Sequence, residues 1–389
     1  MGANSALPKM TIPRKTKKRL GRGGLTESEI PILASTRPML LSLLSVPYLG
    51  WSTHVLPPAH VLPRVAAAGL ARTPPAATHY CRSSDLQLRA DSVQGPMRPG
   101  SLVALVTPMR ADGSVDVERL RSLIQWHLVC ETDGIVALGT TGEASTMSMD
   151  ERATVLGVCR DELAGTGVPL MVGTGTIDPK RVIAMNEQAY EYGADSCLVV
   201  TPYYVKPPQQ AMVTFFETIA DATPLPMLLY NVPGRTASDL QPETVAQLAK
   251  HPKIFGIKEA TGDLTRVEQL QRLCGDDFML LSGEDSNAFE FTLLGGHGTI
   301  SVSSNVAPVR QHAIMKAALA GNADEARRLN KELELLHQRL FSMANPIPVK
   351  WALARMGKIE LGIRSPLCQL DEVYHTGLEE AMTQAGALP

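Results

Sequence analysis

The sequence predicts an α/β fold: a (β/α)8 TIM barrel with a C-terminal helical subdomain and a disordered N-terminal extension. From residue 101 onward, short β-rich runs alternate with helical patterns at spacings of about 28 residues. Each helical pattern places apolar residues at three- and four-residue steps. Eight such strand–helix units are the number that closes this barrel. The predicted strands are 102–106, 134–138, 169–172, 196–200, 227–230, 254–257, 279–281 and 298–302.

The predicted helices lie between these strands and continue beyond the last of them. A helical stretch from about Gly321 to the end of the chain exceeds what the barrel needs, so we expect an appended helical subdomain. The chain therefore divides into an extension at 1–96, a barrel at 97–320 and a helical subdomain at 321–389. The clearest predicted helices are 117–129, 179–192, 209–220, 242–250 and 264–273.

The first 96 residues differ in composition from the rest of the chain. They are rich in Pro, Ser, Ala and Arg, are poor in acidic residues and have no sustained period. Two interpretations remain: an organelle transit peptide, or an over-extended gene start with the protein beginning at Met97. The apolar run at 39–44 is far too short to span a bilayer. We expect a cytoplasmic protein, or a plastid one if 1–96 is a true transit peptide.

Charge and cysteine content exclude several classes of protein. The net charge is −2, and because the extension is basic, the remainder carries an excess of about eleven acidic charges. Such a body has no broad basic patch for nucleic acid. The six cysteines have neither CxxC nor metal-ligand spacing, so we expect reduced core residues in an intracellular protein and no metal site. They are Cys81, Cys130, Cys159, Cys197, Cys274 and Cys368.

Polar residues follow most of the predicted strands at their carboxyl ends. In a barrel these ends form one rim, and the chemistry of such folds lies on the loops of that rim. Hydroxyl groups, one amine and one guanidinium would therefore converge there. The segments concerned are 139–143, 173–176, 201–204, 230–236, 258–259 and 282–285.

Lys258 is the candidate nucleophile at this rim. It ends a short apolar strand, and burial there would disfavour the charged ammonium form of a lysine. A free amine beside a carbonyl substrate forms a Schiff base. A single strand-end lysine is more often simply solvated, but the convergence of polar groups on the same rim favours the catalytic interpretation.

Other segments of the rim each have a chemical and a structural interpretation. Tyr230 would lie beside Lys258 and shuttle protons, or it is a core aromatic with its hydroxyl at the rim. Arg235 would bind a carboxylate, or it is a solvated loop residue. The segment 139–143 would cradle an anion with backbone N–H groups, or it is an ordinary turn; it lacks the Gly-Lys-Ser/Thr of a phosphate-binding loop.

Two further segments have a structural interpretation. The aromatic pair Tyr203 and Tyr204, followed by two prolines, suggests a lid or a subunit contact. The segment 345–350 is predicted to begin a helix, with proline in the first turn and no chemical role.

Five motifs in this order and spacing resemble the dihydrodipicolinate synthase family. The motifs are GTTGE, TPYY, YNVPGRT, GIKEATGD and NPIPVKW, and the resemblance covers about residues 97–388. The family belongs to the pyruvate-dependent class I aldolase group, which includes N-acetylneuraminate lyase. The resemblance implies a barrel enzyme, usually a homotetramer built as a dimer of dimers, that needs no metal or organic cofactor.

The resemblance also implies an activity and a set of site residues. The expected reaction condenses pyruvate with L-aspartate 4-semialdehyde to give 4-hydroxy-tetrahydrodipicolinate, a step of L-lysine biosynthesis through diaminopimelate. Lys258 matches the Schiff-base lysine, Tyr230 the proton donor and acceptor. Thr140 and Tyr204 match the rest of a proton relay, with Tyr204 reaching into a neighbouring subunit's site. The positions that match substrate contacts are Thr141 and Ile300 for pyruvate, and Arg235 for the semialdehyde carboxylate.

The sequence departs from the lysine-inhibited members of the family in one region. Polar or acidic positions of their regulatory pocket are replaced, and an arginine now stands where an acidic residue would bind the ligand's ammonium group. We therefore expect lysine to inhibit weakly or not at all. The positions are Ala144, Ser145, Met149, Arg152, Ile177 and Arg181, with Tyr203 alone retained.

Two rival functions fit the same scaffold. One is an enzyme that uses the same enamine on another aldehyde, such as a sugar-acid lyase. Thr140 and Thr141, together with the segment 231–235, argue against it, because Arg235 suits a short carboxylated aldehyde. The other is a non-catalytic ligand-binding protein, against which the intact set of Lys258, Tyr230, Thr140 and Tyr204 argues.

Overall fold

The computed structural model describes residues 95–388 and has eight parallel strands at its centre. The strands pair in sequence order and close into a barrel, with β1 hydrogen-bonded to β8. The predicted barrel is therefore confirmed, whereas the predictions for 1–94 fall outside the described residues. The strands are β1 Gly100–Ala104, β2 Gly134–Ala137, β3 Leu170–Gly173, β4 Ser196–Val200, β5 Met227–Asn231, β6 Ile254–Glu259, β7 Met279–Ser282 and β8 Gly298–Ser301.

Alternation along the strands separates two apolar layers, because successive side chains of a strand point to opposite faces. In β1, Leu102 and Ala104 belong to the cluster inside the barrel, whereas Val103 belongs to the layer between strands and helices. In β5, Leu228 and Tyr230 likewise belong to the inner cluster. The inner face of β5 thus delivers Tyr230 to the carboxyl end of the barrel.

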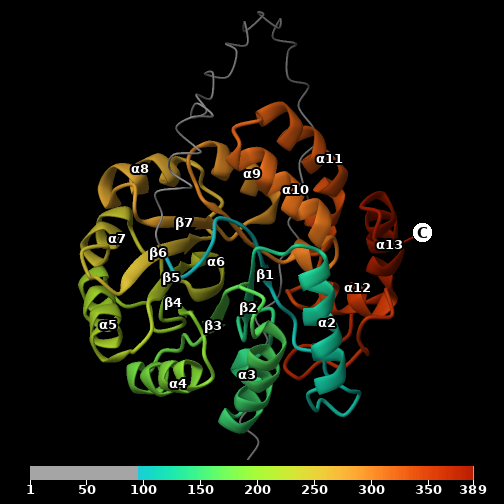
Figure 1. Cartoon of the computed structure of the whole chain (residues 1–389), viewed down its shortest axis with the longest axis horizontal. Coiled ribbons are helices and arrows are strands. Elements are labelled where there is room, and N and C mark those ends of the chain that lie inside the picture. The colour runs from blue at the N-terminus through green and yellow to red at the C-terminus, as the bar shows by residue number, and fades with distance from the viewer. Residues whose placement is uncertain (1–94, 389) are drawn as a thin grey trace, which may run out of the picture. The chain divides into compact units, whose positions relative to one another are not determined.

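Helices surround the barrel, and Figure 1 shows the strands enclosed by them. The predicted helices are confirmed to within two residues at each end. Several begin with a defined cap; Ser148 and Glu151, for example, form a reciprocal capping box at the start of α3. The main helices of the barrel are α2 Val117–Val129, α3 Met149–Leu163, α4 Pro179–Glu191, α5 Gln209–Ala222, α7 Pro242–Leu248, α8 Thr265–Cys274, α9 Ala288–Leu293 and α10 Pro308–Leu319.

Three further helices follow the barrel, as predicted for the C-terminal region. They are α11 Ala323–Arg339, α12 Ile347–Arg355 and α13 His375–Gln384, coloured orange to red in Figure 1. Helix α11 packs against α10 and α13, and the ring of Trp351 in α12 stacks on that of His375 with centroids 4.5 Å apart. The division of the chain at residue 320 stays a prediction.

The prediction that the cysteines are core residues is only partly right. Cys159 and Cys197 are buried, and burial raises the pKa of each thiol to about 12. Cys130 and Cys274 are half-buried at the ends of α2 and α8, and Cys368 is exposed in the segment between α12 and α13. Cys81 falls outside the described residues. None of the helices within 95–388 has the length and apolar character to cross a membrane.

Candidate active site

Lys258 lies near the carboxyl end of β6, directly opposite Tyr230 of β5 in the strand register. Both side chains are buried, at 6% and 8% exposure. The Lys258 Nζ atom lies 4.6 Å from the centroid of the Tyr230 ring. The structure therefore places the amine and the phenol as neighbours at the carboxyl end of the barrel, as the sequence predicts.

Gly283, which follows β7, makes room for the Lys258 side chain. A Cβ atom at this position would lie 2.8 Å from the Lys258 Cε atom and 2.6 Å from the Ala260 Cβ atom. Such separations are well inside van der Waals contact. Glycine here is therefore a steric condition for the observed position of Lys258, a role that no sequence motif indicated.

Ile300 lies inside the barrel, and Thr141 is buried in the loop that follows β2. Ile300 is buried in β8 and belongs to the same apolar cluster as Tyr230. Thr141 is buried, and its Oγ1 atom accepts a hydrogen bond of 3.0 Å from Asn345 Nδ2. Because that oxygen accepts from Asn345, the Thr141 hydroxyl proton remains free to donate to a bound anion.

The segment 345–350 has a structural role that its sequence did not indicate. Proline does lie in the first turn of α12, as predicted. Asn345, however, contacts Thr141, and the buried Lys350 forms an ion pair with the equally buried Glu143. The Glu143 Oε2 atom also accepts from the Arg364 backbone N–H at 3.0 Å. The C-terminal segment thus holds the 139–143 loop in place.

A second polar network fixes the ends of β5 and β6. The amide of Asn231 donates to Glu259 Oε2 at 3.1 Å and to Asp239 Oδ1 at 2.9 Å. Arg266 binds the Asp239 carboxylate at 2.6 and 2.9 Å and lies 3.6 Å from Glu259. Burial raises the pKa of Glu259, while these donors oppose the shift. The network keeps adjacent strand ends, and hence Tyr230 and Lys258, in register.

A cavity of about 400 Å³ opens beside this site. Thr140, Tyr230 and Arg235 line it, together with Asn345. Arg235 extends from the single-turn helix α6 Pro233–Thr236 and is exposed. This volume lies in the usual range of small-molecule sites, and the arrangement suits a substrate that reaches Lys258 past a polar wall.

Four predicted site residues do not line the cavity: Lys258, Thr141 and Ile300, which are buried, and Tyr204, which is exposed. The Tyr204 side chain is 87% exposed. Its backbone has a φ of 72°, an unusual value for a non-glycine residue. Tyr203, in contrast, lines the cavity, and its hydroxyl lies 3.2 Å from Thr176 Oγ1.

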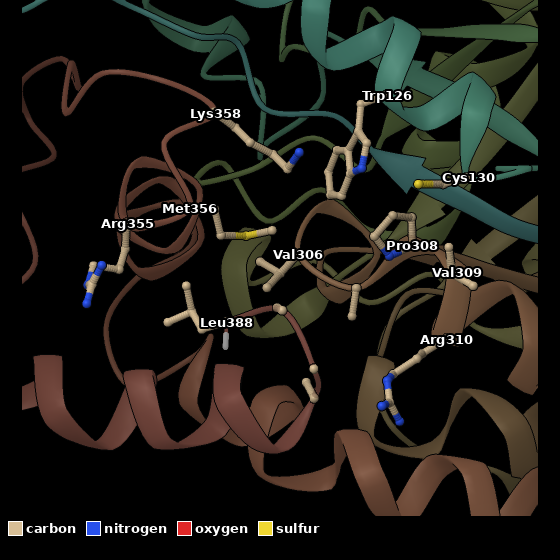
Figure 2. A pocket seen from close by; sticks show the side chains of 14 residues that line it. Trp126, Cys130, Val306, Pro308, Val309, Arg310, Arg355, Met356, Lys358 and Leu388 are labelled. Carbon is tan, nitrogen blue, oxygen red and sulfur yellow. The ribbon is translucent and has the colours of Figure 1, made fainter.

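Two other hollows contain none of the predicted site residues. One, of about 630 Å³, lies between α2, the start of α10 and the C-terminal residues. Figure 2 shows its Lys358 side chain directed toward Trp126, with Nζ 3.6 Å from the ring centroid. Within residues 95–388, no group of three or more His, Cys, Asp or Glu is placed to hold a metal ion.

The fold and the site together define an α/β barrel with a buried lysine and a neighbouring tyrosine at the carboxyl ends of its strands, an arrangement suited to Schiff-base chemistry. The dihydrodipicolinate synthetase family model matches residues 97–385. The chain belongs to this family.

Individual relatives agree with this assignment. The chain is 54% identical to a 4-hydroxy-tetrahydrodipicolinate synthase of Alcanivorax borkumensis, over 74% of this chain and 98% of the relative. A protein of the same name from Teredinibacter turnerae is 48% identical over 75% of this chain and 100% of its own length. The crystal structure of the chloride-inhibited dihydrodipicolinate synthase from Acinetobacter baumannii, complexed with pyruvate, has a TM-score of 0.73 and 44% identity, covering 75% of this chain and 99% of that one.

Proposed function

We propose that this protein is a lyase that condenses pyruvate with L-aspartate 4-semialdehyde to give 4-hydroxy-tetrahydrodipicolinate, in L-lysine biosynthesis through diaminopimelate. The observation that carries the proposal is the buried Lys258 amine beside Tyr230, in a chain of the dihydrodipicolinate synthetase family. The five free cysteines among the described residues are compatible with a cytoplasmic location, which we also propose.

The Lys258 amine starts the reaction by attacking the pyruvate carbonyl. Loss of water gives an imine, and loss of a methyl proton converts it to an enamine. The enamine carbon then forms a bond to the aldehyde carbon of the second substrate. The amine of that substrate displaces Lys258 by transimination, which closes the ring and restores the free lysine.

Tyr230 is the proton donor and acceptor of these steps in our proposal. Its ring lies within 4.6 Å of the Lys258 Nζ atom, and Thr140 lines the same cavity. A phenol and a hydroxyl in sequence can carry protons to and from the carbinolamine. Arg235, an exposed residue of the cavity lining, binds the semialdehyde carboxylate with its forked guanidinium in this proposal.

Thr141 and Ile300 form the proposed pyruvate pocket. The Thr141 hydroxyl donates to the pyruvate carboxylate, because its oxygen is already engaged by Asn345. Ile300 supplies an apolar wall beside the methyl group.

Replacing Asn345 by alanine should raise the KM for pyruvate about tenfold, the effect of one hydrogen bond. The Thr141 hydroxyl would lose the donor that fixes its orientation. Steady-state kinetics with pyruvate varied would measure the change. Ser342→Ala is the matched control, because its hydroxyl bonds only the Arg339 carbonyl in the same segment. An unchanged KM in Asn345→Ala would remove Asn345 from the pyruvate site.

We propose a homotetramer, built as a dimer of dimers, in which Tyr204 completes the relay in a partner's site. The 87% exposure and positive φ of Tyr204 support a residue held out from its own chain. Sedimentation of the full chain as a tetramer is expected; an active monomer would contradict the proposal.

Tyr204→Phe should lower kcat roughly 100-fold, because it removes one member of a proton relay. The unfolding temperature should not change, since only an exposed hydroxyl is lost. Tyr190→Phe, at another exposed tyrosine on α4, is the control. A Tyr204→Phe enzyme with wild-type kcat would exclude Tyr204 from the relay.

Lysine should inhibit this enzyme weakly or not at all. Arg152 and Arg181 line the cavity next to Tyr203, and two guanidinium groups repel the cationic end of lysine. Initial rates measured against lysine concentration would test this prediction. Half-inhibition by lysine at concentrations below about 1 mM would contradict the prediction, because lysine would then bind in spite of the two guanidinium groups.

The proposed reaction is tested by coupled turnover of the purified full chain. Pyruvate and L-aspartate 4-semialdehyde are supplied together with a dihydrodipicolinate reductase, and NADPH consumption is followed. Turnover with both substrates is expected. A protein that forms its pyruvate adduct but gives no turnover would act on another aldehyde, which is the sugar-acid lyase alternative.

A further inference from the structure

Among the residues that line the cavity, cationic side chains outnumber anionic ones. Three arginines line it, Arg152, Arg181 and Arg235, against a single carboxylate, that of Glu143. Glu143 is already paired with the buried ammonium of Lys350. Within residues 95–388, neither Arg152 nor Arg181 forms an ion pair. The end of the cavity formed by these two residues therefore has an excess of cationic groups.

Arg152 is the more unusual of the pair, because it is only 2% exposed. Its Nη2 atom donates to the Gly173 carbonyl oxygen at 3.0 Å, while its Nε atom has no partner. Burial and the nearby charge of Arg181 lower the pKa of Arg152 to about 10. A buried cation without a counter-ion is unfavourable, and a negative group at this end of the cavity would offset the cost.

Both arginines are held in the first turns of neighbouring helices. Arg152 is the fourth residue of α3, which begins with the Ser148–Glu151 capping box. Arg181 is the third residue of α4, whose N-terminus is capped by Asp178. The first turn of a helix adds a positive partial charge to that of the side chains. The helices thus fix the backbone of both arginines. The Arg152 side chain is also held by burial and by its bond to Gly173, whereas the Arg181 side chain is exposed.

We propose that this end of the cavity is a binding site for a small dianion, held between Arg152 and Arg181. Two planar guanidinium groups match the paired oxygens of a dicarboxylate or of a phosphate. Arg152 and Arg181 belong to α3 and α4, whereas Lys258 belongs to β6 and does not line the cavity, although its neighbour Tyr230 does. This inference does not depend on the proposed reaction.

Calorimetric titration of the full chain with succinate and, separately, with inorganic phosphate tests the site. Ionic strength and chloride concentration are held constant, because screening would otherwise change the affinity. We expect saturable binding of at least one of them, and the better ligand distinguishes a carboxylate site from a phosphate site. Absence of saturable binding for both would overturn the proposal.

Variants locate the bound anion. Arg181→Gln should weaken binding roughly 10- to 100-fold, the range for a hydrogen bond to a charged group. Lys180→Gln is the matched control, because Lys180 is an exposed cation of the same turn that does not line the cavity. Arg152→Met should abolish binding, with Arg181→Gln deciding if Arg152→Met does not fold. Equal affinity in Arg181→Gln and the wild type would contradict the proposal.

Blocking the catalytic site tests whether the anion site is distinct from it. Pyruvate is reduced onto Lys258 with borohydride, and the anion titration is repeated. Affinity within about twofold of the untreated protein is expected for an independent site. Loss of binding would place the anion in the pyruvate pocket and overturn the inference. Failure to form the pyruvate adduct on Lys258 would count against the proposed function. The anion site would then be tested by the titration of the untreated protein.

Discussion

Replacing Lys258 by alanine should reduce turnover by at least about 10⁴-fold, the scale of removing a covalent nucleophile. The reason is that the amine supplies both the imine nitrogen and the group later displaced by the product. Tyr230 and Thr140 would remain, but they carry protons and cannot form the covalent bond. The NADPH-coupled assay measures the loss of turnover. The rate of NADPH consumption with the reductase but without this protein sets its detection limit.

Two controls keep this prediction specific. Lys250→Ala removes an exposed lysine outside the site and should retain wild-type activity. The unfolding temperature of Lys258→Ala should stay close to that of the wild type, because the buried lysine forms no ion pair among the described residues. Residual turnover within 100-fold of wild type would overturn the Schiff-base mechanism.

Lys350→Ala should have the largest effect on stability. Its ammonium is buried against the buried carboxylate of Glu143. Burial lowers the pKa of Lys350, and the nearby Glu143 opposes that shift. Removing the ammonium would leave a buried carboxylate without its partner, which costs about 3–5 kcal/mol. Thermal unfolding should then occur roughly 6–20 °C lower.

The double variant Lys350→Met with Glu143→Gln separates loss of the pair from loss of one partner. With both charges removed, no buried carboxylate is left uncompensated, so the double variant should unfold above Lys350→Ala. Glu143 also accepts from the Arg364 backbone N–H, a bond that glutamine can keep. Wild-type stability of Lys350→Ala, or a double variant less stable than it, would contradict the role of this pair.

The barrel and the pair Lys258 and Tyr230 could be predicted because the sequence patterns that indicate them each lie within a short stretch of the chain. Strand and helix periods fix where each strand ends, and parallel strands bring those ends to one rim. Lys258 and Tyr230 follow directly, since each ends an apolar run. The outward position of Tyr204 was also expected from its unusual aromatic segment, although the partner that would receive it stays a proposal.

The support of the site was not predictable in this way. Asn345 contacts Thr141, which lies 204 positions earlier in the chain, and Lys350 contacts Glu143, which lies 207 positions earlier. Contacts across such separations leave no periodic signal in the sequence. The proline near Asn345 and Lys350 predicted only the start of a helix. Gly283 resembled an ordinary loop glycine until the position of Lys258 was known. Arg152 was noted only as a departure from a pattern, and its burial emerged from the packing of α3 against the barrel.

Trapping of the pyruvate imine is the most direct test of the central claim. The full chain is incubated with pyruvate and sodium borohydride, digested and analysed by mass spectrometry. The account predicts one carboxyethyl group, attached to the Lys258 side chain and absent from Lys258→Ala. An unmodified Lys258, or an adduct confined to other lysines, would show that this amine does not form the Schiff base.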